Sequence, residues 1–307
     1  MAKQPKNFYR DISGILLLNK PLGLSSNAAL QRARYIFNAK KAGHTGSLDP
    51  QATGVLPLCF GEATKVSGYL LDSDKRYITT VQLGQTSTTG DTEGDILNTT
   101  TVTEISDQKL AQILERFTGK ITQIPPMYSA LKHNGTPLYK LARQGIEVKR
   151  KQREVTIYEL ILLERTHDTL VLDVRCSKGT YIRTLAQDIG NALGFGAYIT
   201  SLKRTDVSPF DCSKTYTLEE LQKLAEGNDK KQLDNILLPI DTALSNQPKI
   251  ILNDIESTRM KHGLKVTRDD IIDSALIRLY HESGEFIGIG RLSSDKLLAP
   301  KRMMRTN

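Results

Sequence analysis

The order of apolar and polar positions along the chain predicts a mixture of strands and helices. Residues 12–18 form a continuous apolar run, and residues 75–84 alternate between apolar and polar positions, so both segments are predicted strands. Within residues 27–38 the apolar side chains recur at helical spacing, behind serines that can cap a helix. The same reasoning predicts further strands over residues 55–60, 155–164, 169–176 and 194–205 and further helices over residues 62–71, 106–117 and 218–226. This mixture predicts an α+β fold, with a mixed β-sheet and flanking helices.

The last part of the chain is predicted to form a small separate unit. Asn253 and Glu256 have the spacing of a helix capping box, and residues 275–281 and 286–292 form a predicted hairpin. We therefore divide the chain into residues 1–245 and a β-rich unit of residues 246–307.

Bulk charge narrows the class of partner. The chain has 307 residues, enough for about two domains, and carries a net charge of +8. Such an excess of basic residues favours a polyanionic partner, with nucleic acid as the leading candidate.

The cysteines and the apolar runs indicate a soluble, cytoplasmic protein. The three cysteines have no C-x-x-C spacing, so the sequence supports neither a disulfide framework nor a zinc site. Cys59 and Cys176 lie in apolar or strand-like runs, where buried packing is the expected role. Residues 1–10 lack an apolar leader, and no stretch approaches the roughly 18 consecutive apolar residues of a membrane span.

Residues 43–54, Gly-His-Thr-Gly-Ser-Leu-Asp-Pro-Gln-Ala-Thr-Gly, are the strongest candidate for chemistry. Asp49 is the only carboxylate in this stretch, and Pro50 restricts the backbone before it, so the Asp49 side chain leaves the loop in a defined direction. That arrangement suits a nucleophile, although Asp-Pro is also a common way to begin a turn. The stretch lacks the endings of a P-loop and of a Rossmann turn, which excludes those two modes of nucleotide binding.

Residues 39–57, which contain this stretch, resemble the signature of the bacterial TruB family of tRNA pseudouridine synthases. The Lys-Pro-x-Gly turn at residues 20–23, the strand-to-helix segment 176–185 and the segment 194–205 also resemble family motifs. Ser47 stands where the family has Ala, and Lys203 stands where it often has Arg. The resemblance implies isomerisation of the uridine at position fifty-five in the T-loop of tRNA, without a cofactor or a metal.

The resemblance also implies roles for individual residues. Asp49 would be the nucleophile, on C1′ or on C6 of the uridine, and the sequence leaves both open. Arg183 would pair with Asp49 and keep it ionised, because a guanidinium cannot lose its proton. Tyr77 would stack on the target base and accept a proton. The resemblance also implies a role in substrate binding for His44, Tyr181, Leu202 and Lys20.

Several of these side chains also have an ordinary structural alternative. Tyr77 could be a rim residue at the end of a strand, and Leu202 could be core. Lys20 could be a solvated turn lysine and Arg183 a surface arginine near a helix start, since most such residues are exposed.

A basic segment follows the middle of the chain. Residues 132–153 hold seven basic side chains against the single acid Glu147. In the resembling family, residues of this kind form a mobile thumb that closes over RNA, and we place it at about residues 125–153. The acidic stretch 91–95 does not fit a calcium loop, because an EF-hand would need Gly and Glu where Ile96 and Val102 stand. We interpret it as a polar loop at the border of the site.

Three functions remain open on the sequence. The first is a stand-alone enzyme, a monomer acting on the T arm of tRNA with a PUA-like C-terminal domain and no obligate protein partner. The second is the catalytic subunit of a guide-RNA pseudouridylation complex, and the third is a non-catalytic RNA-binding or folding module. The short C-terminal end of the chain favours the first over the second.

Overall fold

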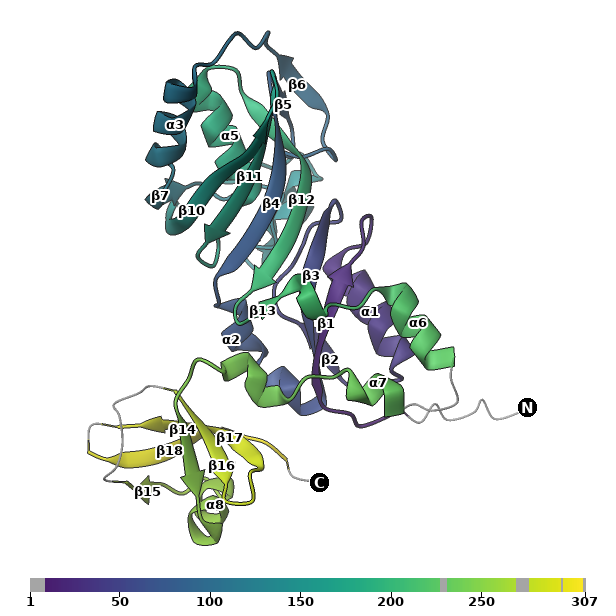
Figure 1. The fold of residues 1–307 in the computed structure, drawn as a ribbon, viewed down its shortest axis with the longest axis vertical. Coiled ribbons are helices and arrows are strands. Elements are labelled where there is room, and N and C mark those ends of the chain that lie inside the picture. Colours follow the sequence, from purple (N-terminus) through teal and green to yellow (C-terminus); the bar gives the residue numbers. More distant parts are fainter. Residues whose placement is uncertain (1–8, 227–230, 269–275, 294, 306–307) are drawn as a thin grey trace.

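The computed structural model describes residues 9–226, 231–268, 276–293 and 295–305, which form two main sheets with their helices and two short two-stranded sheets (Figure 1). The large sheet is mixed, because β12 runs parallel to β3 and antiparallel to β4. From one edge to the other it contains β1 (Gly14–Lys20), β3 (Ala52–Phe60), β12 (Ala197–Val207), β4 (Lys75–Leu83), β11 (Thr169–Cys176), β10 (Arg153–Arg165) and β7 (Gly119–Gln123), with β2 (Ala42–His44) beside β3 and β13 (Phe210–Asp211) beside β12.

Helices cover this sheet in two places, and each packs its apolar side chains against the strands. The helices over β4, β10, β11 and β12 are α3 (Asp107–Arg116) and α5 (Ile182–Leu193). Those beside β1 and β3 are α1 (Ser26–Ile36), α6 (Leu218–Glu226) and α7 (Lys231–Asn235). The shorter elements are η1 (Gly61–Lys65), α2 (Ser67–Leu71), η2 (Cys212–Lys214), η3 (Ile240–Leu244), α4 (Leu138–Ala142) and the two-strand pairs β5 (Gln85–Ser87) with β6 (Ile96–Thr99) and β8 (Lys132–His133) with β9 (Thr136–Pro137).

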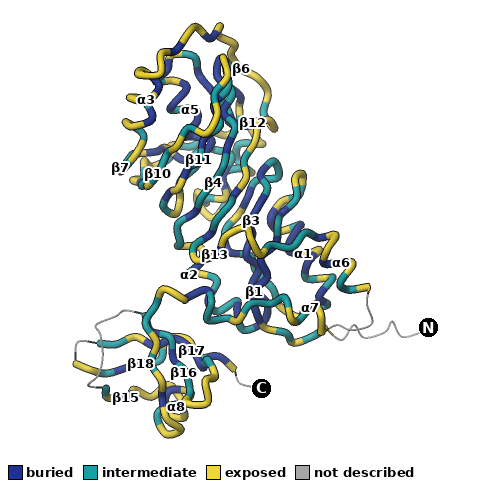
Figure 2. The backbone as a smooth tube through the Cα atoms, viewed as in Figure 1, coloured by how far each residue is buried: buried dark blue, intermediate teal, exposed yellow. Residues whose placement is uncertain are grey.

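Strand β1 explains why one segment reads as a continuous apolar run. Leu16 and Leu18 pack into the cluster with α1 and α6, while Ile15 and Leu17 pack into a cluster on the opposite face. A strand buried on both faces has no polar side to alternate with. Figure 2 shows β1 and β3 buried along most of their length.

The second sheet is formed by the last part of the chain. Its order is β14 (Lys249–Leu252), β16 (Ile277–His281), β17 (Phe286–Leu292), β18 (Leu297–Met303) and β15 (Val266–Thr267), with α8 (Asp254–Lys261) beside it. The predicted capping box of Asn253 and Glu256 is present at the start of α8. The predicted hairpin is also present, although residue 275, where we expected it to begin, lies outside the described residues.

The second sheet is attached to the first through a shared cluster and a few polar contacts. Ile289 and Met304 pack into the same cluster as Ile15 and Leu17. The Tyr280 hydroxyl donates to Asp241 at 2.6 Å. The two sheets therefore share an apolar seam.

Two predicted elements differ from the structure. Residues 62–71 form not one helix but η1 and α2, which meet at the fully buried Val66, a β-branched residue that packs into the core and is a weak helix former. The strand predicted from residue 194 begins at Ala197, because Gly194, with φ +96°, ends α5 in the left-handed conformation. The α+β class with a mixed sheet is confirmed.

Both strand cysteines are buried, as predicted. Burial raises the pKa of the Cys59 and Cys176 thiols to about 12, so they stay protonated and pack as small apolar groups. Among the described helices, none combines the length and the apolar character that crossing a bilayer requires.

Candidate active site

The Asp49 loop, residues 43–54, connects β2 to β3 and is fixed on both sides of its carboxylate. The Ser26 hydroxyl, in the first turn of α1, accepts a hydrogen bond from the Leu48 N–H (2.7 Å) and donates one to the Leu48 carbonyl (3.0 Å). On the other side, the Ala52 N–H donates to the Asp49 carbonyl at 3.0 Å. The backbone that presents the Asp49 carboxyl therefore has little freedom.

Lys20, the last residue of β1, braces the same loop. Its side chain is fully buried, and Nζ donates to the carbonyls of Pro21 (2.8 Å), Leu24 (2.6 Å) and Pro50 (3.4 Å). Burial is the main reason that the pKa of Lys20 falls to about 8, against the attraction of Asp49, which raises it. The alternative of a solvated turn lysine is wrong, because three carbonyls take the place of water around the ammonium. A contact with substrate stays a prediction.

The carboxyl of Asp49 meets the guanidinium of Arg183, as predicted. Arg183 Nη2 lies 2.9 Å from Asp49 Oδ2, and Arg183 Nη1 lies 3.5 Å from Asp91 Oδ2. Arg183 also donates to the carbonyls of Thr89 and Tyr128, both at 2.8 Å. Only 6% of its side chain is exposed, so it is not a surface arginine.

The surroundings of Asp49 act on its ionisation in opposite directions. Burial is the largest influence and raises the pKa of the Asp49 carboxyl, whereas the charge of Arg183 lowers it and that of Asp91 raises it. At the same time 41% of the Asp49 side chain is exposed, so a ligand can reach its oxygens. A carboxylate that is accessible and held by an arginine is arranged for nucleophilic attack or for proton transfer.

A small hollow opens beside Asp49. Its volume is about 10 Å³, the space of one water molecule. Leu202, a predicted pocket residue, lines it and also packs against the core below, so the structure accommodates both interpretations of this leucine. The full lining is Asp49, Gln51, Ala52, Asp91, Thr92, Ile199, Thr200, Ser201 and Leu202.

The other predicted residues surround the loop at different depths. Tyr77, on β4, is partly buried and lies opposite Arg204 of β12; burial raises the pKa of its phenol, and the Arg204 charge lowers it. Tyr181 is the N-cap residue of α5, two positions before Arg183. His44, on β2, is half-buried, and burial lowers the pKa of its ring, which keeps the imidazole neutral.

Three polar residues of this region received no role from sequence reasoning. Asp91, 4% exposed, joins the ion pair; its only signal was an acidic loop at the border of the site. Gln123, the last residue of β7, accepts from the Tyr181 N–H (3.0 Å) and donates to the Tyr181 carbonyl (3.2 Å). Arg204 is 1% exposed and lies beneath the loop. No local pattern marks the last two.

The thumb, residues 125–153, reaches the site through the Tyr128 carbonyl, which accepts from Arg183, and is held together by contacts of its own. Arg150 donates to the Pro125 carbonyl (3.3 Å) and pairs with Glu147 (2.8 Å), so it holds the thumb together. Lys149 and Lys151 on either side of it are exposed. A cleft of about 480 Å³ separates the thumb from α5. Lys149 and Lys151 are therefore available to bind a polyanion, whereas Arg150 is engaged within the thumb.

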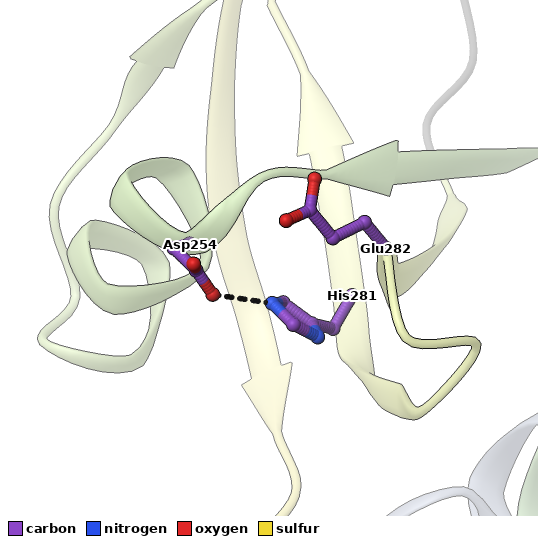
Figure 3. Close-up of side chains that lie close together, drawn as sticks. All are labelled: Asp254, His281 and Glu282. Atoms are coloured by element: carbon purple, nitrogen blue, oxygen red, sulfur yellow. Dashed lines mark hydrogen bonds and ion pairs between the residues drawn. The ribbon is translucent and has the colours of Figure 1, made fainter.

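A cluster in the second sheet has the residue types of a metal site, but its histidine nitrogens are already hydrogen-bonded. Asp254, His281 and Glu282 lie close together (Figure 3). His281 Nε2 is 2.8 Å from Asp254 Oδ1, and His281 Nδ1 is 2.8 Å from the Ser283 hydroxyl. Both ring nitrogens are thus engaged, and we interpret the cluster as a link between α8 and the β16–β17 turn.

Solved structures share this arrangement of elements. A structure described as "Crystal Structure of a Cbf5-Nop10-Gar1 Complex" has a TM-score of 0.73 and 26% identity, over 96% of this chain and 82% of that one. A second, "Structure of H/ACA RNP bound to a substrate RNA containing 2'-deoxyuridine", has a TM-score of 0.74 and 23% identity, over 99% and 88% of the two chains, and shows the fold alone. The α+β fold with its mixed sheet is therefore one that this chain shares with these solved structures.

The sequence comparisons give the family. Residues 34–182 match the model for "TruB family pseudouridylate synthase (N terminal domain)", residues 183–245 the "tRNA pseudouridylate synthase B C-terminal domain", and residues 248–304 "Pseudouridine synthase II TruB, C-terminal". Proteins named tRNA pseudouridine synthase B from Pseudomonas putida (strain GB-1) and Pseudomonas syringae pv. syringae (strain B728a) are each 52% identical over 303 residues, 99% of either chain. This chain belongs to the TruB family of pseudouridylate synthases.

Proposed function

We propose that this protein is a tRNA pseudouridine synthase that isomerises the uridine at position fifty-five, in the T-loop, to pseudouridine. The observation that carries the proposal is the 2.9 Å pair of Asp49 and Arg183 beside a hollow. The pair occurs in a chain that is 52% identical, over nearly its whole length, to a curated tRNA pseudouridine synthase B.

In the proposed reaction Asp49 is the nucleophile, and Arg183 keeps it ionised against the burial that raises its pKa. The N-glycosidic bond breaks, the uracil rotates, and a bond forms between C5 of the base and C1′ of the ribose. C5 loses its proton and N1 gains one, so atoms balance without an oxidant. Attack of Asp49 on C1′ and attack on C6 are both compatible with an accessible carboxylate.

We assign the proton transfer to Tyr77. Burial raises the pKa of its phenol, and the charge of Arg204, its register partner across the β4–β12 ladder, opposes that shift by favouring the phenolate. The tyrosine also offers an aromatic face on which a base can stack.

The target base has to be flipped out of the T-loop, and the protein has to open to receive it. A uridine inside a folded RNA loop cannot reach the partly exposed carboxylate of Asp49 unless it leaves its stack. The hollow of about 10 Å³ holds one water, so a uracil enters only if the lining moves. His44, neutral and half-buried at the start of the loop, is placed to stack on displaced bases.

For recognition we propose contacts from the thumb and from residues 246–307. Lys149 and Lys151 are exposed on the thumb, where they can meet phosphates of the T arm. We expect a PUA-like role in RNA binding for the second unit, and a monomeric protein that acts in the cytoplasm without a guide RNA.

The test is conversion of an unmodified tRNA transcript by the purified protein alone, followed by mapping of pseudouridines along the RNA. The proposal predicts one modified position, in the T-loop, and none in a transcript whose target uridine is replaced by cytidine. Conversion that requires a guide RNA or added proteins would support a guide-dependent subunit instead. Binding of tRNA without any conversion would support a non-catalytic RNA-binding module.

A further inference from the structure

Arg204 is a buried cation without an ion-pair partner. Its side chain is 1% exposed, and no described carboxylate forms an ion pair with it. Nε donates to the Val55 carbonyl at 2.8 Å, while Nη2 is buried and has no hydrogen-bond partner among the described residues. Leaving a charge in this state costs stability, so a purely structural role explains it poorly.

The Asp49 loop passes close to this arginine at two points. Gly54 is paired in register with Arg204, has φ +102°, and would place a Cβ only 2.1 Å from the Arg204 carbonyl oxygen. A Cβ on Gly46 would lie 3.8 Å from Arg204 Nη1. The loop therefore closes over Arg204. Glycine at position 54 lets β3 pack closely against β12, because any side chain there would clash with the Arg204 carbonyl.

Tyr77 lies on the other side of the same arginine. Arg204 is its register partner in the antiparallel β4–β12 ladder, so the two side chains leave the sheet on the same face. Burial raises the pKa of the Tyr77 phenol, and the Arg204 charge is the largest influence that opposes it. Burial lowers the pKa of the His44 ring, and the charge of Arg204 lowers it further.

We propose that Arg204 is a positioning residue, whose guanidinium holds the Asp49 loop against β12 and sets the Tyr77 phenol for proton transfer. This inference deepens the proposed function and rests on it. We assign Arg204 no contact with substrate, since its Nη2 is enclosed by the surrounding protein. It acts through Tyr77 and through the backbone of the loop.

The first test is a double-mutant cycle between the two positions. Arg204→Met keeps the length of the side chain and removes the charge. We expect it to slow single-turnover conversion of tRNA by about 10²-fold, the usual size of an acid–base contribution, with tRNA affinity unchanged. In a Tyr77→Phe background the same change should slow conversion by less than about threefold, because the phenol through which it acts is already gone. Independent losses that multiply in the double variant would overturn the proposal.

Stability and the conservative variant separate positioning from simple packing. Replacing an unpaired buried charge with an apolar side chain is often neutral or stabilising, so Arg204→Met is expected to unfold at the temperature of the wild type or above it. Arg204→Lys keeps the charge and should recover at least tenfold of the lost rate. Recovery by Lys together with an unchanged melting temperature supports the proposal; a rate loss that follows the melting temperature contradicts it.

The second test measures the pKa of the Tyr77 phenol directly and needs no enzymatic turnover. 3-Fluorotyrosine is incorporated in place of tyrosine, Tyr77→Phe identifies the fluorine resonance of position 77, and its titration is followed by NMR. Arg204→Met should raise the pKa of this phenol, whereas Lys203→Met, which removes an exposed cation from the same strand, should leave it unchanged. An unchanged pKa in Arg204→Met overturns the inference. If the wild type makes no pseudouridine the proposed function fails, and this titration still decides whether Arg204 acts on Tyr77.

Discussion

The Asp49 loop and the thumb both contact Arg183, but the protein holds them in different ways. The loop, residues 43–54, lies between buried side chains: Ser26 and Lys20 bind its backbone, and Arg204 lies beneath it. The thumb, residues 125–153, contributes no side chain to any of the four hydrophobic clusters of the described residues. Its connection to Arg183 is one hydrogen bond, from the guanidinium to the Tyr128 carbonyl.

This difference separates the requirements of chemistry from those of recognition. A nucleophile has to be held within a fraction of an ångström of its working position, which requires buried and fully bonded supports. A surface that closes over a large polyanion needs exposed charges and a low cost of movement, which few apolar contacts provide. Changes in the loop should therefore act on the rate of conversion, and changes in the thumb on RNA binding.

The largest effect is expected at Asp49. Asp49→Asn keeps the size of the side chain and removes the proposed nucleophile, so single-turnover conversion should fall by 10⁴-fold or more, on the order seen when a nucleophile is lost. tRNA affinity, measured by filter binding, should change less than about threefold. Asp95→Asn, at an exposed acid of the neighbouring loop, is the matched control and should convert tRNA at the normal rate. A large loss of affinity in Asp49→Asn would break the separation of roles.

The next effect is expected at Arg183. Burial raises the pKa of Asp49 and Arg183 lowers it, so removing the cation in Arg183→Met raises that pKa further. Asp49 is then protonated over a wider acidic range. The acid limb of the rate against pH should move to higher pH, and the rate at neutral pH should fall by about 10²- to 10³-fold.

Arg183→Lys is the control for charge at this position. It keeps a cation but not the planar donors that reach two carboxylates and two carbonyls, so its acid limb should lie between those of the wild type and Arg183→Met. Single-turnover rates across the pH range in which each variant stays folded provide the comparison. An acid limb that stays in place in Arg183→Met would show that Asp49 does not depend on Arg183 for its charge.

Sequence reasoning succeeded where a short segment carries its own signal. The strand β4, the capping box at Asn253 and the ion pair of Asp49 with Arg183 were all expected, the last from two separate motifs. It failed where the cause lies far along the chain. Lys20 reads as a solvated lysine until the Pro50 carbonyl, 30 residues later, joins two others around its ammonium.

Other features have no sequence signal for the same reason. The partner of Gln123 is 58 residues away, and a single amide at the end of a strand suggests no role. The strand order of the large sheet, in which β12 lies between β3 and β4, depends on long-range pairing that a single chain's pattern does not encode. Nor does the apolar pattern of residues 62–71 reveal that Val66 interrupts the helix.

A smaller effect is expected at Gln123, which joins the root of the thumb to the first turn of α5. Gln123→Met keeps the volume and leaves the Tyr181 N–H and carbonyl without their partner, which should cost about 1–3 kcal/mol of unfolding free energy. Conversion should slow by about tenfold, because Arg183 follows Tyr181 by two residues and would be held less firmly in position. Urea unfolding and single-turnover rates measure the two losses, with Gln222→Met, on the exposed face of α6, as the control. Unchanged stability would remove Gln123 as the joint between the two regions.

The smallest effect is expected on the thumb itself, from the double change Lys149→Ala with Lys151→Ala. Both side chains are exposed, whereas Arg150 between them bonds Pro125 and Glu147 and is left in place so that the thumb keeps its shape. Each lost phosphate contact should reduce the slope of log affinity against log salt by about 0.7 to 0.9, because fewer counterions are released on binding.

The measurement for the thumb is tRNA affinity from low to physiological salt, with the rate of conversion determined at saturating tRNA. We expect a flatter slope and a few-fold weaker affinity at low salt, and a saturated rate close to that of the wild type, since the charges that act on the Asp49 carboxyl are those of Arg183, Asp91 and Lys20. Lys223→Ala, an exposed lysine on α6, controls for net charge and should leave the slope unchanged. A saturated rate that falls together with the affinity would mean that thumb closure also assembles the site around Arg183, through its bond to the Tyr128 carbonyl, and the two regions would then act as one.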